Sequence, residues 1–196
     1  MIRTFQIALF GVMVLAQLAV PTWMIGGHEW SMRNGTAYKF LTAPIDPYDA
    51  FRGKYVALAF ESNHAPVDKG VQLSAGETVY VTVETGPTGY ARLSNASTFP
   101  PNGTNYITTR VLHEIPRDAA DNADNEVAVD LPFDRYYMDE NLAPLAEQAY
   151  RANSTQATRN CYATVRVYKG KAVIEELFIE DMPVADFLAQ HQEFGP

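Results

Sequence analysis

The chain has 196 residues, of which 47% are hydrophobic, so it is long enough for one domain with a packed core. Its 15 basic and 23 acidic residues give a net charge of -8. This balance argues against a general nucleic-acid-binding protein, because phosphate recognition needs a dense Lys and Arg surface. The single cysteine, Cys161, excludes an internal disulfide and a Cys-rich zinc or iron–sulfur site.

Residues 4–26 form a run without any charged residue. As a helix this run reaches ~34 Å, which is enough to cross a bilayer core of ~30 Å. The run therefore predicts a membrane anchor at residues 1–27, followed by a single domain at residues 28–196. Two alternatives stay open, a cleaved signal peptide and a helix of a soluble core. A signal peptide usually has an apolar core of about 7–15 residues that ends in a small-x-small site, and this run is longer.

The charge distribution around this run bears on orientation. Arg3 precedes the run, which favours a short tail inside the cytoplasm and a domain outside it. We therefore expect a single-pass protein of the cytoplasmic membrane with its C-terminal domain outside the cytoplasm. Since Arg3 is the only charged residue before residue 27, the rest of the chain carries 14 basic and 23 acidic residues, a net charge of -9.

Patterns typical of β-strands dominate the remaining sequence. Residues 77–85, for example, alternate valines with polar or larger side chains, as a half-buried strand does. The turn at 169–170 is typical of a tight hairpin. The predicted strands are 36–42, 54–61, 77–85, 89–95, 104–112, 126–133, 161–168 and 171–179. Short strands separated by Gly, Pro and Asn turns predict a mainly β fold, as an antiparallel sandwich or a partly open barrel.

Two short helices are predicted by apolar residues at helical spacing, at 140–152 and at 183–192. Asp139 and Asp181 lie near the two starts, where each can cap a helix. Glu140 falls in the first turn of the earlier helix, where a carboxylate complements the helix dipole. We expect both helices to pack on the sheet.

The densest motif lies at residues 44–60. Pro44 and Pro47 favour an extended entry, and Asp46 or Asp49 can cap a single helical turn at 49–51. Arg52 is three residues from Asp49, close enough to pair with it. Gly53 permits the positive φ that ends the turn and starts the strand containing Tyr55. The segment predicts a rigid turn that feeds a core strand and presents a candidate binding site.

This segment resembles the GDYXXLXY family of bacterial membrane-anchored proteins. The motif reads Gly53-Lys54-Tyr55-Val56-Ala57-Leu58-Ala59-Phe60, with Lys54 in place of the motif aspartate and Phe60 in place of the last tyrosine. The exchange at Lys54 reverses a charge, so this chain lacks the carboxylate of the family motif at that position. The resemblance implies a membrane-anchored, mainly β domain and no established activity.

A second segment is similar to the family's Arg-Tyr-Phe-x-x-Glu element, which leads from a strand into a helix. Here it contains Arg135, Tyr137 and Glu140, which form a candidate polar site. The alternative is a plain helix start, with Asp139 as the cap. Residues 163–182 look like the family's closing hairpin.

An enzyme is the alternative from another class. Ser31 lies just after the apolar run, loosely as in bacterial signal peptidases, with Lys39 or Lys54 as the candidate base. The Pro-Thr expected after Ser-Met is absent. The four histidines are scattered and form no zinc motif, so we expect no metal and no cofactor. Cys161 has the pattern of a small core residue.

The sequence favours a membrane-anchored accessory or binding module that acts through a membrane-protein partner and not through catalysis. A membrane-anchored hydrolase with Ser31 as nucleophile is the first alternative. A module whose aromatic sheet binds a small apolar ligand is the second.

Overall fold

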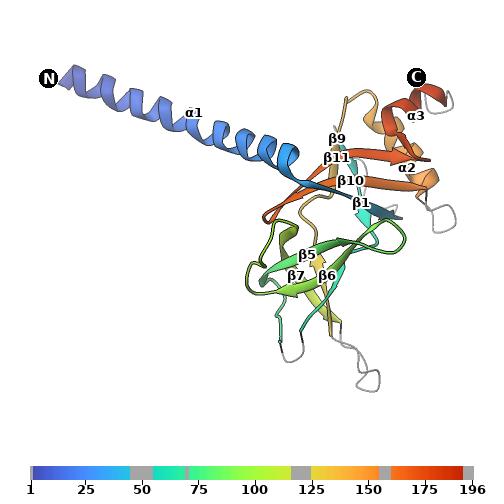
Figure 1. The fold of residues 1–196 in the computed structure, drawn as a ribbon. Coiled ribbons are helices and arrows are strands. Elements are labelled where there is room, and N and C mark those ends of the chain that lie inside the picture. The colour runs from blue at the N-terminus through green and yellow to red at the C-terminus, as the bar shows by residue number, and fades with distance from the viewer. Residues whose placement is uncertain (1, 45–54, 69–70, 116–124, 155–159, 192–196) are drawn as a thin grey trace.

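The computed structural model describes residues 2–44, 55–68, 71–115, 125–154 and 160–191. Helix α1 (Ile2–Asn34) projects as one continuous rod from a β domain, and the N-terminus lies at the far end of the rod (Figure 1). Within the domain, two antiparallel sheets and a two-stranded ribbon surround one hydrophobic core. The predicted mainly β fold is confirmed.

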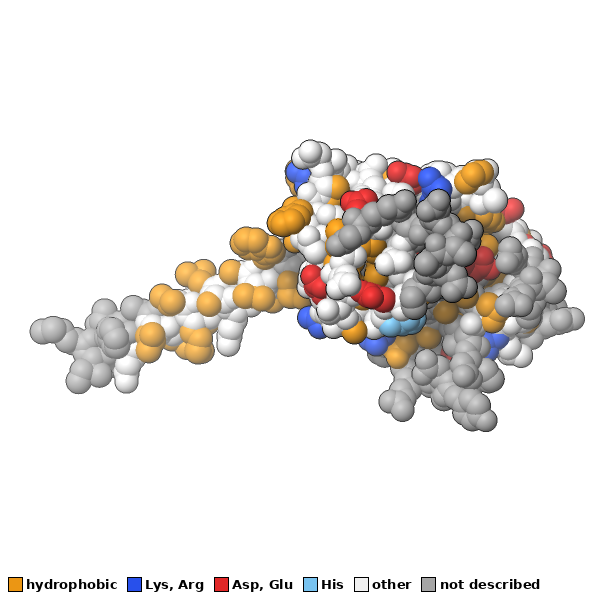
Figure 2. All heavy atoms as spheres, turned by 90° about the horizontal axis from the view of Figure 1, so that it is seen from below, with side chains coloured by type: hydrophobic (Ala, Val, Ile, Leu, Met, Phe, Trp, Pro, Cys, Tyr) orange, Lys and Arg blue, Asp and Glu red, His pale blue; other side chains and the backbone are white. Residues whose placement is uncertain are grey.

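Helix α1 contains the candidate transmembrane helix that the sequence predicts. Its stretch Leu9–Asn34 is long and apolar enough to cross a membrane, and its most apolar window is not buried against the domain. Hydrophobic side chains are spread along the part of the protruding rod that is drawn in colour (Figure 2). The helix continues without a break through the predicted boundary at residue 27 and ends at Asn34, one residue before the first strand begins. The boundary itself stays a prediction.

The first sheet has five strands and packs next to the end of α1. Its central strands β1 and β10 pair antiparallel from Thr36 opposite Val167 to Leu41 opposite Tyr162. In spatial order the strands are β12 (Met182–Pro183), β11 (Lys171–Ile179), β10 (Cys161–Tyr168), β1 (Thr36–Ala43) and β3 (Ala59–Phe60). Cys161 is buried in the core as predicted.

The second sheet also has five antiparallel strands, and it closes on itself. In spatial order they are β4 (His64–Pro66), β8 (Glu126–Asp130), β7 (Tyr106–Ile115), β5 (Thr78–Thr85) and β6 (Ala91–Ser97). A backbone bridge between Val67 and Ala96 joins the two outer strands, which gives this sheet the form of a small barrel. Strand β4 falls in a segment without strand periodicity, and the sequence did not predict it.

The predicted strand at 54–61 is wrong in one respect, because the structure divides it at Leu58. Strand β2 (Tyr55–Ala57) pairs with β9 (Arg135–Tyr137) in a separate ribbon, whereas β3 pairs with β1. The Leu58 N–H donates to the Asp134 carbonyl at 2.8 Å, so the backbone changes partner at this residue. A break of this kind leaves the apolar alternation intact and is therefore invisible in the sequence.

The predicted tight hairpin between β10 and β11 is confirmed and also connects the two sheets. Lys169 and Gly170 have φ values of 45° and 84°, as a two-residue hairpin turn requires. Gly170 accepts a hydrogen bond from the Thr108 N–H at 2.9 Å and donates one to the Tyr106 carbonyl at 2.8 Å. The turn therefore docks on β7 of the second sheet.

Two short helices pack on the strands, as predicted, α2 against β2 of the ribbon and α3 against β11 of the first sheet, but their starts differ. Helix α2 (Ala143–Asn153) begins later than expected, so the prediction that Glu140 lies in its first turn is wrong. Asp139 instead accepts a hydrogen bond from the Asn141 N–H at 2.8 Å within the preceding turn. Helix α3 (Val184–Gln190) has no side-chain cap, so the expected cap by Asp181 is also wrong. Asp181 has a positive φ of 61° in the turn after β11.

Candidate functional site

The ribbon of β2 and β9 brings together the two segments that the sequence singles out. Tyr55, from the first motif, lies directly opposite Tyr137, from the second. Arg135 lies opposite Ala57, two residues further along the same ribbon. Side chains two apart on a strand share a face, so Arg135 and Tyr137 point to the same side. Antiparallel pairing thus places three of the predicted site residues in one cluster.

Aromatic and cationic contacts hold this cluster together. The ring centroids of Tyr55 and Tyr137 are 5.7 Å apart, and the Arg135 guanidinium lies 5.2 Å from the Tyr55 ring centroid. A hydrogen bond with Tyr137 and the nearby charge of Asp134 raise the pKa of Arg135. Tyr137 is 67% exposed although it is a large aromatic residue. The cluster is therefore an exposed amphipathic surface and not part of the core.

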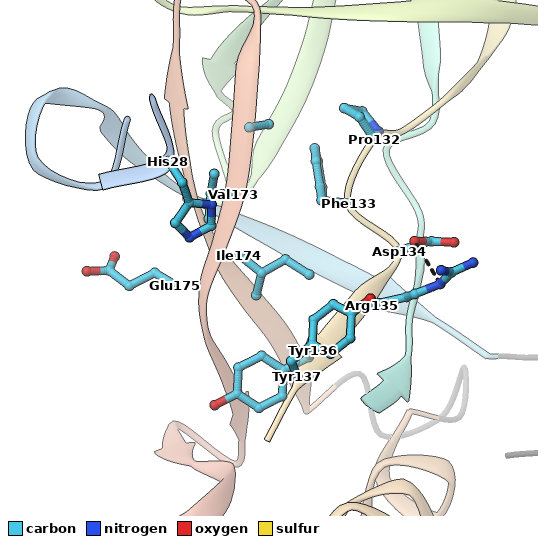
Figure 3. A pocket seen from close by; sticks show the side chains of 11 residues that line it. His28, Pro132, Phe133, Asp134, Arg135, Tyr136, Tyr137, Val173, Ile174 and Glu175 are labelled. Carbon is cyan, nitrogen blue, oxygen red and sulfur yellow. Dashed lines mark ion pairs between the residues drawn. The ribbon is translucent and has the colours of Figure 1, made fainter. Parts of the chain in front are cut away.

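A groove of about 530 Å³ lies beside this cluster. One wall is the segment from Pro132 to Tyr137, and the other is β11 from Ala172 to Glu175. Figure 3 shows the two walls facing each other, with Asp134 and Arg135 on one and Val173, Ile174 and Glu175 on the other. His28, in the part of α1 that follows the apolar run, also lines the groove. The groove therefore lies next to the C-terminal part of α1, just after the charge-free run at residues 4–26.

The two walls meet at a hydrogen bond between Tyr136 and Glu176. The Tyr136 hydroxyl donates to Oε1 of Glu176 at 2.6 Å. Burial and this bond raise the pKa of Tyr136 well above its usual range. Glu175, the preceding residue on β11, makes two hydrogen bonds of 2.8 and 2.9 Å with the Arg166 guanidinium. The charged groups of this wall are thus fixed in place.

The other predicted site residues have different outcomes. Asp46, Asp49, Arg52 and Gly53 lie outside the described residues, as does Lys54. Glu140 lies in the turn before α2 and does not line the groove. Tyr136 and Glu176, which join the walls, were not predicted as site residues. No sequence signal identifies this pair, because their contact depends on how β9 approaches β11.

The residues proposed for an enzyme have structural contacts instead. Ser31 is buried, with 1% exposure, and its hydroxyl donates to the Gly27 carbonyl at 3.0 Å. The Lys39 ammonium lies 4.8 Å from the Tyr162 ring centroid. Burial raises the pKa of Cys161 to about 12, which keeps the thiol protonated. The described residues contain no group of three or more His, Cys, Asp or Glu that could hold a metal ion.

The aromatic residues expected in the ligand-binding alternative pack on one another. Phe40, Phe60 and Phe133 form three edge-to-face contacts with centroid distances of 5.0 to 5.9 Å. A second hollow of about 460 Å³ lies between β1, β5 and residues 101–106, and hydroxyl and amide side chains dominate its lining. Neither feature favours a small apolar ligand.

Comparison with protein-family models shows which family the chain resembles. The model described as GDYXXLXY protein matches residues 17–177, which include the second half of the apolar run, both motif segments and most of β11. No curated protein and no solved structure gives a significant match.

Proposed function

The chain belongs to the GDYXXLXY protein family, and from this premise we propose that it is a membrane-anchored binding module for a membrane-protein partner. One observation carries the proposal: both motif segments converge on an exposed ribbon beside a groove that adjoins the end of the apolar helix. A site this close to the bilayer favours a partner that is itself in the membrane. The exposed Tyr137 and the neighbouring Arg135 are residue types enriched where proteins bind one another.

The proposed address is the cytoplasmic membrane, with the β domain outside the cytoplasm. The basic residue before the apolar run supports this orientation. Thiol labelling tests it, since buried Cys161 is the only native cysteine and provides a silent background. A cysteine placed at exposed Thr88 should react with a membrane-impermeant maleimide in intact spheroplasts. Labelling only after the membrane is opened would reverse the orientation.

Photocrosslinking in native membranes tests the binding function. A photoreactive phenylalanine derivative at Tyr137 should crosslink to a multi-span membrane protein. Phe99 is the matched control, because it is an exposed aromatic residue (76%) in the loop after β6 and does not line the groove. Equal crosslinking from both positions, or crosslinks from Tyr137 to lipid alone, would contradict the proposal.

A further inference from the structure

Both walls of the groove are strand edges without a strand partner. On β11, the short strand β12 pairs only with Phe178 and Ile179, so residues 171–176 have β10 on one side and no strand on the other. On β9, strand β2 occupies one side only. In the described part of the chain no strand pairing joins β9 to β11. The first sheet and the ribbon thus leave an open gap between residues 171–176 of β11 and residues 135–137 of β9, which we call the seam. The second sheet, in contrast, closes through its backbone bridge.

The hairpin geometry decides which backbone groups of β11 face the seam. Tyr168 and Lys171 flank the two-residue turn and form a hydrogen-bonded pair. In an antiparallel ladder, hydrogen-bonded and non-hydrogen-bonded pairs alternate along the strand. Ala172 and Ile174 therefore direct their N–H and C=O groups away from β10 and toward the seam, whereas Val173 directs its groups to β10.

The same alternation orients β9. Asp134 uses its carbonyl to accept the Leu58 N–H, so Asp134 and Tyr136 face β2 with their backbone groups. Arg135 and Tyr137 consequently direct their backbone groups to the seam. Among the described residues, neither Arg135 nor Tyr137 makes a backbone hydrogen bond to another segment on that side. Within the described part of the chain, two rows of backbone donors and acceptors without a strand partner therefore border the groove.

Unpaired strand edges are templates for an added strand. We propose that the seam between β9 and β11 binds an extended, basic segment of the membrane-protein partner by strand addition. The segment would pair with β11 along residues 172–175, which at ~3.3 Å per residue is a length of ~13 Å. This inference rests on the proposed function and names how the partner is bound.

The charges at the seam argue for a basic segment. Arg166 neutralises Glu175, and Arg135 lies 3.6 Å from Asp134. Glu176 accepts hydrogen bonds from the Tyr136 hydroxyl and the Leu177 N–H, but no Lys or Arg among the described residues pairs with it. Lys171 supplies a cation at the start of β11, whereas Glu176, the sixth residue of that strand, has no cationic partner among the described residues. A Lys or Arg side chain of the bound segment complements Glu176.

The position of the seam argues for a segment close to the bilayer. His28 lines the groove one residue after the glycine pair that follows the apolar run. Gly27 lies against the Lys171 side chain, at the end of β11 where the seam begins. A segment that leaves the membrane beside α1 therefore reaches the seam within a few residues.

Hydrogen exchange on the full chain in lipid nanodiscs provides the direct test. The probe is a synthetic octapeptide that alternates Lys and Val. It should slow exchange of the Ala172 and Ile174 amides by about tenfold or more, a change typical of newly paired backbone groups. The Val81 amide, in central strand β5, should not change. A peptide with Glu in place of Lys, and a Lys–Val peptide methylated on its backbone nitrogens, should have no effect.

Two variants separate backbone pairing from charge. Ala172→Pro removes a seam-facing N–H and should weaken peptide binding about fivefold, the loss expected for one net backbone hydrogen bond. Val173→Pro is the control for this orientation, since it removes a ladder bond with β10 and should unfold the hairpin. Glu176→Gln keeps the acceptor for Tyr136 and should weaken binding and reduce its salt dependence. Glu84→Gln makes the same charge change on β5 and should alter neither peptide binding nor its salt dependence.

Several results would overturn strand addition. These are peptide binding without protection of the seam amides, equal binding of the Glu peptide, and the same protection from vesicles of anionic lipid alone. If Ala172→Pro does not fold, two measurements still test strand addition. They are the hydrogen exchange of the wild-type chain with the peptide and the peptide binding of Glu176→Gln. If Ala172→Pro folds and the membrane-protein crosslink from Tyr137 persists unchanged, strand addition is wrong while the proposed binding function stands.

Discussion

Tyr55 and Tyr137 lie directly opposite each other on strands β2 and β9, with ring centroids 5.7 Å apart. Tyr55 belongs to the first family motif and Tyr137 to the second, so this pair joins two segments that are distant in sequence. Arg135 lies over the Tyr55 ring and completes the contact. The family's two motif segments therefore form one surface feature, although each could be read as a local structural turn.

Tyr137→Ala should lower the free energy of unfolding by only about 0.5–1 kcal/mol, because a cross-strand aromatic pair contributes about this much and Tyr137 is largely exposed. Urea denaturation of the purified chain measures this value. Phe99→Ala, at an exposed position that has no ring partner among the described residues, should change the free energy of unfolding by less. A loss of several kcal/mol for Tyr137→Ala would mean that the residue is part of the core rather than of a binding surface.

Gly170→Ala should destabilise the domain more than Gly76→Ala. Both glycines have φ of 84°, so an added Cβ brings about 1 kcal/mol of backbone strain at either position. At Gly170 the new Cβ would also collide with Thr108 Oγ1, where the hairpin docks on β7. At Gly76 it would meet no atom within 4 Å. Thermal unfolding should therefore give a lower midpoint for Gly170→Ala; equal midpoints would show that the turn does not hold the sheets together.

Gly35→Ala should loosen the junction between α1 and the first sheet. A Cβ at this position would lie 2.5 Å from the Ser31 carbonyl oxygen and 3.2 Å from the Val167 carbonyl oxygen. Backbone atoms yield little, so we expect a loss of about 1–3 kcal/mol. Gly26→Ala is the matched control, since no atom lies within 4 Å of its added Cβ. Limited proteolysis between α1 and β1 should be faster in Gly35→Ala than in the wild type, and unchanged in Gly26→Ala.

Tyr150→Phe should cost about 1 kcal/mol at pH 7, because the buried hydroxyl donates to the Ala43 carbonyl at 2.9 Å. Burial raises the pKa of Tyr150 to about 12, above the ordinary value of about 10. The folded state thus favours the neutral hydroxyl. Its stabilisation is fully present below pH 10 and is lost as the pH rises from about 10 to 12.

Urea denaturation between pH 7 and pH 11.5 measures this dependence. The wild type should lose stability above pH 10, and Tyr150→Phe should lose less over the same interval. The pKa of Tyr162 is also raised to about 12, so part of the pH dependence of the free energy of unfolding should remain in the variant. Identical slopes for the two proteins would contradict the buried, neutral state of Tyr150.

The amino-acid sequence by itself determined the candidate membrane helix, the mainly β class, the hairpin at 169–170 and the core position of Cys161. Each of these follows from local information: the length of an apolar run, alternation with a period of two, and turn residues that allow positive φ. The expected starts of α2 and α3 were less accurate, because capping at Asp139 and Asp181 depends on the turns that precede each helix.

Only the tertiary structure decided how the strands meet. The sequence predicted one strand at 54–61, yet the Leu58 N–H pairs with Asp134 and divides it between two sheets. The same division pairs Tyr55 with Tyr137 and leaves β9 and β11 as facing edges, which the hydrogen bond between Tyr136 and Glu176 connects. Alternation of apolar residues fixes which face of a strand is buried, but it contains no information about which strand lies alongside. That choice depends on backbone hydrogen bonds between distant segments, and it creates the seam on which the proposed binding depends.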